Sequence, residues 1–345
     1  MDFYFEEAGR DALEAYVEKF KPAKIIVLTD TNTQKFCLPI FQKQVSFEFT
    51  NVNIKNGDVH KNIDTLTGIW KQLLSAGVDR KSLMINLGGG VVTDIGGFAA
   101  VTYKRGIDFI HVPTTVLGMV DAAIGGKNGI NFESAKNQIG TIVQPAFIWI
   151  NPLFLKTLEQ QEFNSGFSEM LKHGLIADAD YWEALIHYSK HPDKQQLLDL
   201  IKTSVYIKNS VIRKDPTEKG LRKILNFGHT LGHAIESYLN YDKQHPLSHG
   251  YAVAIGMVLA AYLSSKQTHL PLKTAVQIKQ ELNRIYPVIN FSKTDIEAII
   301  NLLKYDKKNE NGIVKFVLLT EIGKAVYNKE VFIEDIYEAF NFYKA

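Results

Sequence analysis

Residues 85–97, INLGGGVVTDIGG, decide the fold class of the first half of the chain. An apolar run from Leu83 to Leu87 is typical of a buried strand, and it leads through Gly88, Gly89 and Gly90 into a segment with helical character. Glycine lets the backbone come close to a ligand, and the free N–H groups at the start of a helix favour phosphate. The stretch therefore predicts a strand, a turn and a helix that can hold the pyrophosphate of a dinucleotide.

This glycine turn differs from the usual dinucleotide fingerprint. The fingerprint has a glycine at the position that Thr93 fills, so the same glycines also fit a tight turn that packs a helix on a sheet. Asp94, one turn into the helix, can cap its amides or hold a ribose or the nicotinamide amide. Asp30 and Asn32, which follow an earlier strand, can form an Asx turn or contact the adenosine ribose. The residues alone leave these alternatives open.

The glycine turn lies within an alternation of short strands and helical segments. The predicted strands are Ile25 to Thr29, Val45 to Ile54, Leu83 to Leu87, Phe109 to Val112 and Phe147 to Ile150. Parallel neighbours need a crossover connection, and helical patterns fill the gaps between these strands. Residues 1–152 therefore predict an α/β, Rossmann-like domain with a mostly parallel sheet.

The pattern changes after Asn151 and Pro152. The segments predicted to be helical are Glu159 to Ile176, Gln195 to Ile212, Gly220 to Leu239 and Gly250 to Lys266. One small hairpin is expected, in which Ile313 to Leu319 pairs with the stretch near Lys324 to Tyr327. Residues 153–345 thus predict a mainly α-helical second domain, which suits a chain too long for one ordinary core.

Composition indicates a folded protein without a nucleic-acid partner. Hydrophobic residues make up 46% and charged residues 22% of the chain, the balance of a globular protein. The net charge of +2 comes from 39 basic and 37 acidic side chains that are mixed along the sequence. Since nucleic-acid binding usually needs a clustered basic run, we expect no DNA or RNA partner.

The sequence also predicts a location. The opening MDFYFEEAGR lacks the basic, apolar and small-residue order of a secretory signal. The longest apolar stretch, near Gly250 to Leu263, is too short to cross a bilayer, so no membrane association is expected. Cys37 is the only cysteine and cannot form an intrachain disulfide, which fits a reducing compartment. We therefore expect a cytoplasmic protein.

Three potential metal ligands occur in the second half: Glu169, His229 and His249. Two imidazoles and one carboxylate form a recurrent catalytic zinc set that leaves positions open for water or substrate oxygens. His233 is four residues after His229, so on a helix both rings share one face and could bind the same ion. A plainer alternative for Glu169 is an i,i+3 ion pair with Lys172. Spacing alone does not show that the ligands meet.

Several cationic side chains lie in small or apolar surroundings. They are Arg105, Lys127, Lys136, Lys172, Lys208, Arg222 and Lys307. A substrate with both a phosphate and a carboxylate needs several such partners, although any single lysine can also be ordinary solvated charge. Lys127 differs from the others because Gly125, Gly126 and Gly129 surround it, a composition typical of a ligand-binding loop.

Longer blocks of sequence carry a family resemblance. The blocks are GGGVVTDIGGFAAVTYKRG, VPTTVLGMVDAAIGGKNGIN, KNQIG, SEMLKHG, KGLRKILNFGHTLGHAIE, HGYAVAIGM and DKKN, followed by FVLLTEIGKA. In order and spacing, over nearly the whole chain, they resemble the 3-dehydroquinate synthase family of sugar phosphate cyclases. Related polyol dehydrogenases share the glycine turn and a metal-bearing helical domain, but the GHTLGHAIE and GGKNGIN blocks are not expected together in them.

The resemblance assigns roles to individual residues. It implies that Glu169, His229 and His249 bind zinc, for which cobalt could substitute, and that His233 is not a ligand. His233 would face the substrate phosphate with Lys127, Asn137, Asn226 and Lys307. Lys172, Lys208 and Arg222 would meet the substrate carboxylate or its hydroxyls, Asp121 and Glu218 would orient the polar network beside the metal, and Arg105 would reach the site of a neighbouring subunit. The positions matching NAD contacts are Asp30, Asn32, Asp58, Lys61, Gly89, Gly90, Asp94, Thr114, Thr115, Lys127, Lys136 and Thr157.

The resemblance also implies an activity and an assembly. The expected reaction converts 3-deoxy-D-arabino-heptulosonate 7-phosphate into 3-dehydroquinate and phosphate, a step of the shikimate pathway to aromatic amino acids. It combines transient NAD-dependent oxidation, phosphate elimination, reduction and intramolecular aldol closure. Residues 1–152 would bind NAD, residues 153–345 would bind metal and substrate, and the expected assembly is a homodimer. The alternatives are another sugar phosphate cyclase, whose substrate lacks the carboxylate, and a metal-dependent polyol dehydrogenase.

The chain departs from the family pattern at three places. Asn128 follows the loop lysine where Thr or Val is frequent, and Asp58 occupies a position where Glu is usual. The segment between His233 and His249 is a few residues longer than is common. These departures leave every required charge in place and put only the local geometry in question.

Overall fold

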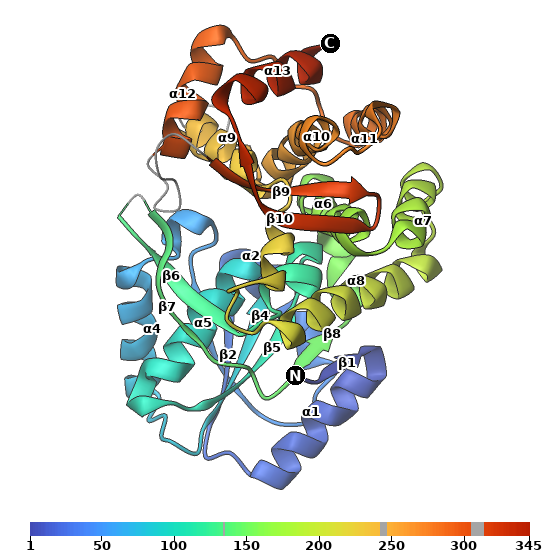
Figure 1. Cartoon of the computed structure of the whole chain (residues 1–345). Coiled ribbons are helices and arrows are strands. Elements are labelled where there is room, and N and C mark those ends of the chain that lie inside the picture. Colours follow the sequence, from blue (N-terminus) through green and yellow to red (C-terminus); the bar gives the residue numbers. More distant parts are fainter. Residues whose placement is uncertain (134, 242–246, 305–313) are drawn as a thin grey trace. The chain divides into compact units, whose positions relative to one another are not determined.

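The computed structural model describes residues 1–345 except 134, 242–246 and 305–313. Its contacts divide the chain into two compact units, Met1–Glu159 and Gln160–Ala345. Each unit has its own core and is described separately below, with the element labels of Figure 1.

The first unit contains a six-stranded sheet in the order β1-β8-β5-β4-β2-β3. The strands are β1 (Phe3–Phe5), β2 (Ile25–Asp30), β3 (Thr50–Ile54), β4 (Leu83–Gly88), β5 (Asp108–Pro113) and β8 (Ile148–Ile150). All neighbouring pairs run parallel, which confirms the predicted α/β class. The strand predicted from Val45 begins only at Thr50, and β1 was not predicted.

Helices cover both faces of this sheet, as a parallel sheet requires. Alternate residues of each strand point to opposite sides, so Ile26 and Leu28 join one core cluster while Val27 joins the other. The first cluster includes residues of α4 (Ile63–Ser75) and α5 (Gly90–Thr102). The second includes residues of α1 (Glu6–Phe20) and α3 (Leu38–Gln42), and the short α2 (Thr31–Phe36) follows β2. Strands β2, β4 and β8 are accordingly almost entirely buried and mostly apolar.

The predicted ligand loop at Lys127 is a strand. Lys127 begins β6 (Lys127–Phe132), which pairs antiparallel with β7 (Ala135–Ile142). Gly126 supplies a positive φ of 69° just before β6. A Cβ at Gly129 would lie 2.5 Å from the Ile139 carbonyl oxygen, so this glycine serves close strand pairing. The glycines around Lys127 therefore build a hairpin that was not predicted from the sequence.

The second unit is mainly helical, as predicted. Its helices are α6 (Gln160–Ala177), α7 (Ala179–Lys190), α8 (Lys194–Lys214), α9 (His229–Tyr241), α10 (His249–Gln267), α11 (Leu272–Ile285), α12 (Lys293–Lys304) and α13 (Ile333–Lys344). The predicted hairpin is present as β9 (Val314–Glu321) antiparallel to β10 (Lys324–Val331), and residue 313 lies outside the described residues. Helix α10 is buried along most of its length and packs against α6, α9, α11 and α13.

The single helix predicted from Gly220 to Leu239 is wrong. A 3-10 helix, η5 (Leu221–Asn226), ends before α9 begins at His229, and Gly228 between them has a φ of 77°. Space also requires glycine there, because a Cβ on Gly228 would lie 2.6 Å from Cγ of Met257 on α10. The break lets His229 start a new helix. Among the described residues, no helix combines the length and the apolar character that spanning a bilayer requires.

Candidate active site

The second unit brings Glu169, His229 and His249 together from three helices. Glu169 lies in the middle of α6 with no exposed side-chain surface, while the imidazoles are the first residues of α9 and α10. Nε2 of His229 is 3.4 Å from Oε1 of Glu169, and Nε2 of His249 is 3.6 Å from the same oxygen. The packing of α6, α9 and α10 therefore brings together three side chains that are far apart in the sequence.

Their spacing fits a divalent metal ion. Zinc binds nitrogen and oxygen ligands at about 2.0–2.2 Å, so two ligands at a tetrahedral angle are about 3.3–3.6 Å apart. The two Nε2-to-Oε1 distances fall in or at the edge of this range. Oε1 of Glu169 is also buried and accepts no hydrogen bond from the described residues. A buried acceptor of this kind needs a partner, and a cation would satisfy it.

The other ring nitrogen of each imidazole has its own partner. Nδ1 of His229 is 3.1 Å from the carbonyl oxygen of Phe227, and Nδ1 of His249 is 3.1 Å from Oε2 of Glu236. When Nδ1 carries the proton and donates it to these acceptors, the Nε2 lone pairs face Glu169. Both rings are thus oriented for binding a metal through Nε2.

Burial and neighbouring charges set the protonation of the three groups. Burial lowers the pKa of His229 to about 3, although the negative charge of Glu169 acts to raise it. For His249 burial also acts downward, but the negative carboxylates of Glu169 and Glu236 outweigh it and raise the pKa to about 9. Burial alone would raise the pKa of Glu169, yet the Lys172 ammonium and then the two imidazoles hold it well below its usual range.

Lys172 forms the predicted i,i+3 ion pair with Glu169. Its side chain is 1% exposed, so the small value expected for an exposed pair does not apply. A buried carboxylate is far less costly when a cation compensates it. The ion pair with Lys172 and metal binding by Glu169 are therefore compatible, because Lys172 contacts Oε2 of Glu169 while both imidazoles approach Oε1.

His233 lies beside the two candidate imidazole ligands. Its ring centroid is 5.1 Å from that of His229 and 5.5 Å from that of His249. The three histidines offer ligand atoms within 4.8 Å of one another, although His233 is exposed. Geometry thus leaves His233 within reach of the same ion. Its assignment as a non-ligand stays a prediction.

Several residues predicted to bind the anionic substrate are buried in the same unit. Lys172, Lys208 and Arg222 are 1%, 6% and 3% exposed. A buried cation is costly without an anionic partner, which sets these three apart from solvated surface lysines. The guanidinium Nη1 of Arg222 donates to the Pro216 carbonyl at 2.8 Å. Nδ2 of Asn226 donates to Oε1 of Glu218 at 2.9 Å.

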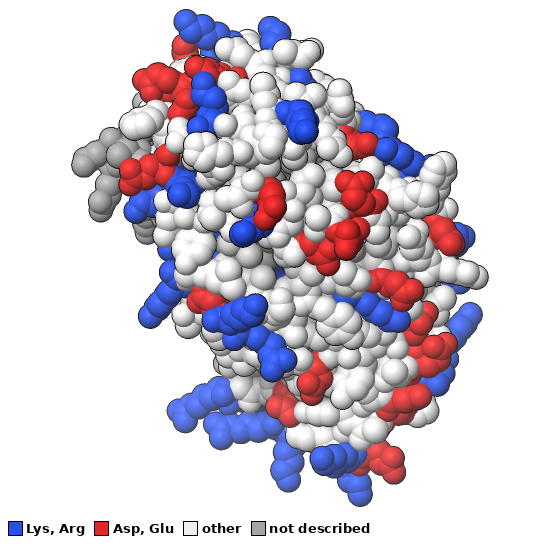
Figure 2. Space-filling view, turned by 45° about the vertical axis from the view of Figure 1, so that its right-hand side comes forward, with Lys and Arg blue, Asp and Glu red and all other residues white. Residues whose placement is uncertain are grey.

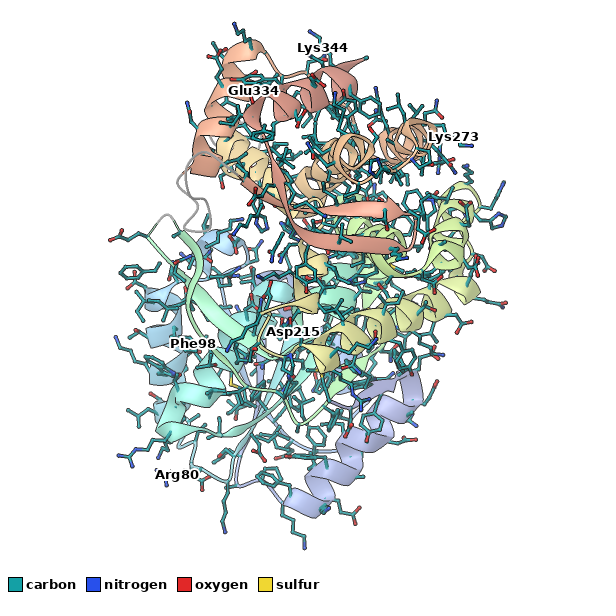
Figure 3. All side chains as sticks on the ribbon, viewed as in Figure 1. Arg80, Phe98, Asp215, Lys273, Glu334 and Lys344 are labelled. Carbon is teal, nitrogen blue, oxygen red and sulfur yellow. The ribbon has the colours of Figure 1, made fainter. Side chains whose placement is uncertain are left out.

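Asp215 organises the loop that carries Glu218 and Arg222. It is the C-terminal cap of α8 and is labelled in Figure 3. Its carboxylate accepts the backbone N–H groups of Lys219, Gly220 and Arg222 at 3.1, 2.7 and 3.0 Å. These backbone hydrogen bonds hold the pKa of Asp215 below its usual value. Sequence reasoning missed Asp215, although the Asp-Pro pair that it forms with Pro216 is a turn signal.

In the first unit, five of the predicted nucleotide contacts lie at one edge of the sheet, where its strands end at their carboxyl termini. Gly89 and Gly90 follow the carboxyl end of β4, Thr114 and Thr115 follow β5, and Asp30 ends β2. Ligands of open parallel sheets bind outside the carboxyl ends of the strands, where the strand order reverses. The order β5-β4-β2-β3 provides such a reversal next to β4.

The glycine turn joins β4 to α5 at this edge. Gly89 is the N-terminal cap of α5, and the helix begins at Gly90, as the sequence predicted. A Cβ on Gly89 would lie 3.0 Å from Cγ2 of Thr115, and one on Gly90 would lie 3.0 Å from Cβ of Ala122. Glycine at both positions therefore avoids crowding Thr115 and Ala122 at the start of α5, where the first backbone N–H groups of a helix can bind phosphate.

Asp30 acts as a helix cap in this structure. Its Oδ1 accepts hydrogen bonds from the backbone N–H groups of Asn32 and Thr33 at 2.9 and 2.8 Å. The hydroxyl oxygen of Thr33 in turn accepts the backbone N–H of Asp30. The capping alternative is thus realised for Asp30. Contact of Asp30 and Asn32 with an adenosine ribose stays a prediction.

Lys61 links three of the predicted site residues. Its side chain is 6% exposed, and Nζ lies 3.0 Å from Oδ2 of Asp94, 2.7 Å from Oδ1 of Asn137 and 3.5 Å from Oδ1 of Asp58. Burial raises the pKa of Asp94 to about 6, against the opposing attraction of Lys61. Lys136 in turn lies 3.4 Å from Asp58. The aspartate at position 58 therefore keeps two lysine partners.

The remaining predicted residues have varied settings. Arg105 is exposed at the end of a short 3-10 helix, and Lys127 is also exposed. Asn128 is buried, and its side-chain amide donates hydrogen bonds to the carbonyl oxygens of Gly126 and Val143 at 2.8 Å each. Asp121 lies in a π-helical turn of the first unit, and Thr157 ends the 3-10 helix Pro152–Thr157. Lys307 lies outside the described residues, as does part of the longer segment before His249. On the face drawn in Figure 2, acidic and basic side chains are interspersed.

Family models and relatives match the chain along most of its length. The model described as 3-dehydroquinate synthase N-terminal matches residues 51–165, and the C-terminal model matches residues 166–309. A 3-dehydroquinate synthase of Parabacteroides distasonis is 40% identical over 97% of this chain and 95% of its own length. One from Acetivibrio thermocellus is 39% identical over 86% of this chain and 82% of its own.

Solved structures with the same fold include two other cyclases. A 2-deoxy-scyllo-inosose synthase complexed with carbaglucose-6-phosphate, NAD+ and Co2+ superposes with a TM-score of 0.84 at 26% identity, covering 98% of this chain and 95% of that one. A 2-epi-5-epi-valiolone synthase from Streptomyces hygroscopicus with NAD+ and Zn2+ bound superposes with a TM-score of 0.85 at 25% identity. This match covers 99% of this chain and 96% of that one. A probable glycerol dehydrogenase from Sinorhizobium meliloti shares only the fold, with a TM-score of 0.60 at 11% identity and coverage of 99% and 95%.

Proposed function

The chain belongs to the 3-dehydroquinate synthase family, and on that premise we propose that it converts 3-deoxy-D-arabino-heptulosonate 7-phosphate into 3-dehydroquinate and phosphate. The protein is an enzyme, and NAD and a divalent metal ion are its cofactors. The observation that carries the proposal is that Nε2 of His229 and Nε2 of His249 both approach Oε1 of Glu169 at metal-ligand spacing.

The residues of this chain hold the two cofactors in distinct places. Glu169, His229 and His249 would hold the metal, and the edge formed by Gly89, Gly90 and the residues after β5 would hold NAD. When bound, the metal acidifies a substrate hydroxyl and NAD+ accepts and returns a hydride. Lys172 neutralises part of the charge on Glu169, which keeps the ligand carboxylate ionised without water.

The substrate offers a carboxylate, hydroxyls and a phosphate. The buried cations Lys208 and Arg222 suit the carboxylate and the hydroxyls, with Arg222 able to pair in a bidentate manner. His233, Asn226, Lys127 and Asn137 are the proposed phosphate partners. Holding one flexible intermediate through oxidation, elimination, reduction and ring closure is mainly a positioning task, which such a set of polar contacts can perform.

We expect Asp215→Asn to weaken substrate binding selectively. Both carboxylate oxygens of Asp215 accept backbone N–H groups, but in asparagine one of these oxygens is replaced by an NH2 group, which donates. The loop carrying Glu218 and Arg222 would therefore lose hydrogen bonds that hold it in place. The expected result is a decrease in kcat/KM of at least about tenfold, mostly through KM, with unchanged metal affinity. Steady-state kinetics and a metal titration of the same variant check this. An unchanged KM would show that the loop holds its geometry without Asp215.

A second variant, Asp94→Asn, separates stability from cofactor binding. The folded-state pKa of Asp94 is about 6, above its ordinary value, so the folded protein holds this proton more tightly than the unfolded chain does. The associated stability is complete below about pH 4 and is lost as the pH rises through about 6. Relative to wild type, the variant should therefore gain stability between pH 4 and 7, by up to about 3 kcal/mol.

NAD+ affinity should move in the opposite direction in Asp94→Asn. If the carboxylate accepts a ribose or amide hydrogen bond, its loss costs about 1.5–3 kcal/mol of binding, or about tenfold or more in affinity. Thermal midpoints across the pH range and an NAD+ titration at pH 7.5 measure both effects. Unchanged NAD+ affinity would leave Asp94 only its contact with Lys61.

The proposed reaction has a direct test. Purified protein is incubated with zinc, a catalytic amount of NAD+ and the heptulosonate phosphate, while phosphate and 3-dehydroquinate are followed together. Equal release of both products without net NADH supports the proposal. Accumulation of NADH with a polyol would identify a dehydrogenase instead, and turnover only with a sugar phosphate that lacks the carboxylate would identify a sister cyclase.

The proposal includes a cytoplasmic homodimer. The single cysteine, Cys37, is buried and free, as expected in a reducing compartment. Light scattering of the purified protein measures the assembly, and a monomer that retains full activity would contradict the expected role of Arg105 in a neighbouring site.

A further inference from the structure

The carboxylate of Glu236 is buried beside the candidate metal ligands. Glu236 lies on α9, is 4% exposed, and places Oε2 3.1 Å from Nδ1 of His249 at the start of α10. It shares its helix with His229 and His233, at i+7 and i+3 from them, so the helical repeat puts all three side chains toward one face. A glutamate is almost never this buried without a specific partner.

The two imidazoles of the centre are held in the same manner by different groups. His229 has Nδ1 3.1 Å from the Phe227 carbonyl and Nε2 3.4 Å from Glu169. His249 has Nδ1 3.1 Å from Glu236 and Nε2 3.6 Å from Glu169. Each ring is therefore fixed from both sides, and Glu236 does for His249 what a backbone carbonyl does for His229.

We propose that Glu236 is a positioning residue that accepts the Nδ1–H of His249, fixes the orientation of its ring and keeps the Nε2 lone pair directed at the metal. This inference rests on the proposed function, because it concerns the same metal centre. A carboxylate in this place also makes the imidazole a stronger ligand than a neutral acceptor would. Glu236 is predicted to contact neither the metal nor the substrate.

Two substitutions of Glu236 distinguish its parts. Glu236→Gln keeps the shape and an oxygen acceptor but removes the charge, whereas Glu236→Leu removes the acceptor as well. Loss of a residue that orients a metal-binding histidine typically lowers metal affinity by about 10–100-fold. We expect about tenfold for glutamine and up to about 100-fold for leucine.

A matched control is a carboxylate on another helix that also contacts α9. Oδ1 of Asp295 on α12 accepts the hydroxyl of Tyr238 on α9 at 2.6 Å, so Asp295→Asn alters a carboxylate that contacts α9 without touching an imidazole. Full-length wild type and the three variants are stripped of metal with a chelator and titrated with Co2+, whose absorption bands report both affinity and coordination. Thermal midpoints of the metal-free proteins report folding.

The expected result is a graded loss of Co2+ affinity and an altered Co2+ spectrum in the two Glu236 variants, with Asp295→Asn within about twofold of wild type. Equal Co2+ affinity in wild type and Glu236→Gln, or an equal loss in Asp295→Asn, overturns the inference while leaving the proposed function intact. If Glu236→Leu does not fold, the glutamine variant decides alone. Wild type that binds no Co2+ overturns both the inference and the proposed function.

Discussion

His229→Ala is expected to abolish specific metal binding and with it the reaction. His229 supplies one of the two Nε2 atoms near Oε1 of Glu169, and its pKa of about 3 keeps the ring neutral at physiological pH. Losing a group that only orients a ligand already costs about 10–100-fold in affinity, so loss of the ligand itself should exceed about 100-fold. Metal content after dialysis and turnover of the heptulosonate phosphate measure the two effects.

His233→Ala is the matched control for this experiment. His233 is on the same helix, one turn away, and its ring centroid is 5.1 Å from that of His229. We expect this variant to keep its metal and to lose turnover, because His233 is assigned to the substrate phosphate. NAD+ affinity should stay near normal in both variants, since the predicted nucleotide contacts belong to the first unit. An active His229→Ala protein without metal, or metal loss equal in both variants, would contradict the proposed ligand set.

The sheet and the main helices could be predicted because periodicity and glycine placement are local signals. Strands β2, β4 and β5 were placed within a residue or two, and α5 starts at the predicted glycine turn. The β6–β7 hairpin was missed because its glycines serve strand pairing, and the sequence cannot distinguish that use from a ligand loop. The break at Gly228 was missed because the helical pattern continues on both sides of it.

The site was predictable in its residue types but not in its geometry. Glu169, His229 and His249 have the composition of a zinc site, yet only the packing of α6, α9 and α10 brings the two imidazole Nε2 atoms to 3.4 and 3.6 Å from Oε1 of Glu169. Glu236 and Asp215 were overlooked because each acts on another residue through a contact that the sequence does not reveal. An acidic residue on a helix is usually solvated, and only burial or a specific partner distinguishes these two.

The close packing of α10 on α6 gives the second large expected effect, that of Gly250→Ala. A Cβ at this position would lie 2.1 Å from the carbonyl oxygen of Ser165 and 2.5 Å from its Cα, so the added methyl meets backbone that cannot rotate away. The N–H of Gly250 also donates to Oγ of Ser165 at 3.1 Å. Overpacking of this kind typically costs about 1–3 kcal/mol, and the metal-free protein should melt several degrees lower, at about 2–4 °C per kcal/mol.

Gly250→Ala should also damage the metal centre, because the same contact sets its geometry. Gly250 directly follows His249 on α10, and Ser165 is one helical turn before Glu169 on α6. Moving α10 away from α6 would therefore lengthen the distance between the ligands Glu169 and His249. Metal affinity should therefore fall together with the melting temperature. Gly68→Ala is the matched control: Gly68 lies within α4, nothing would come within 4 Å of its Cβ, and alanine there should stabilise by up to about 1 kcal/mol. If Gly250→Ala binds Co2+ as tightly as Gly68→Ala does, the α6–α10 contact does not control the ligand spacing.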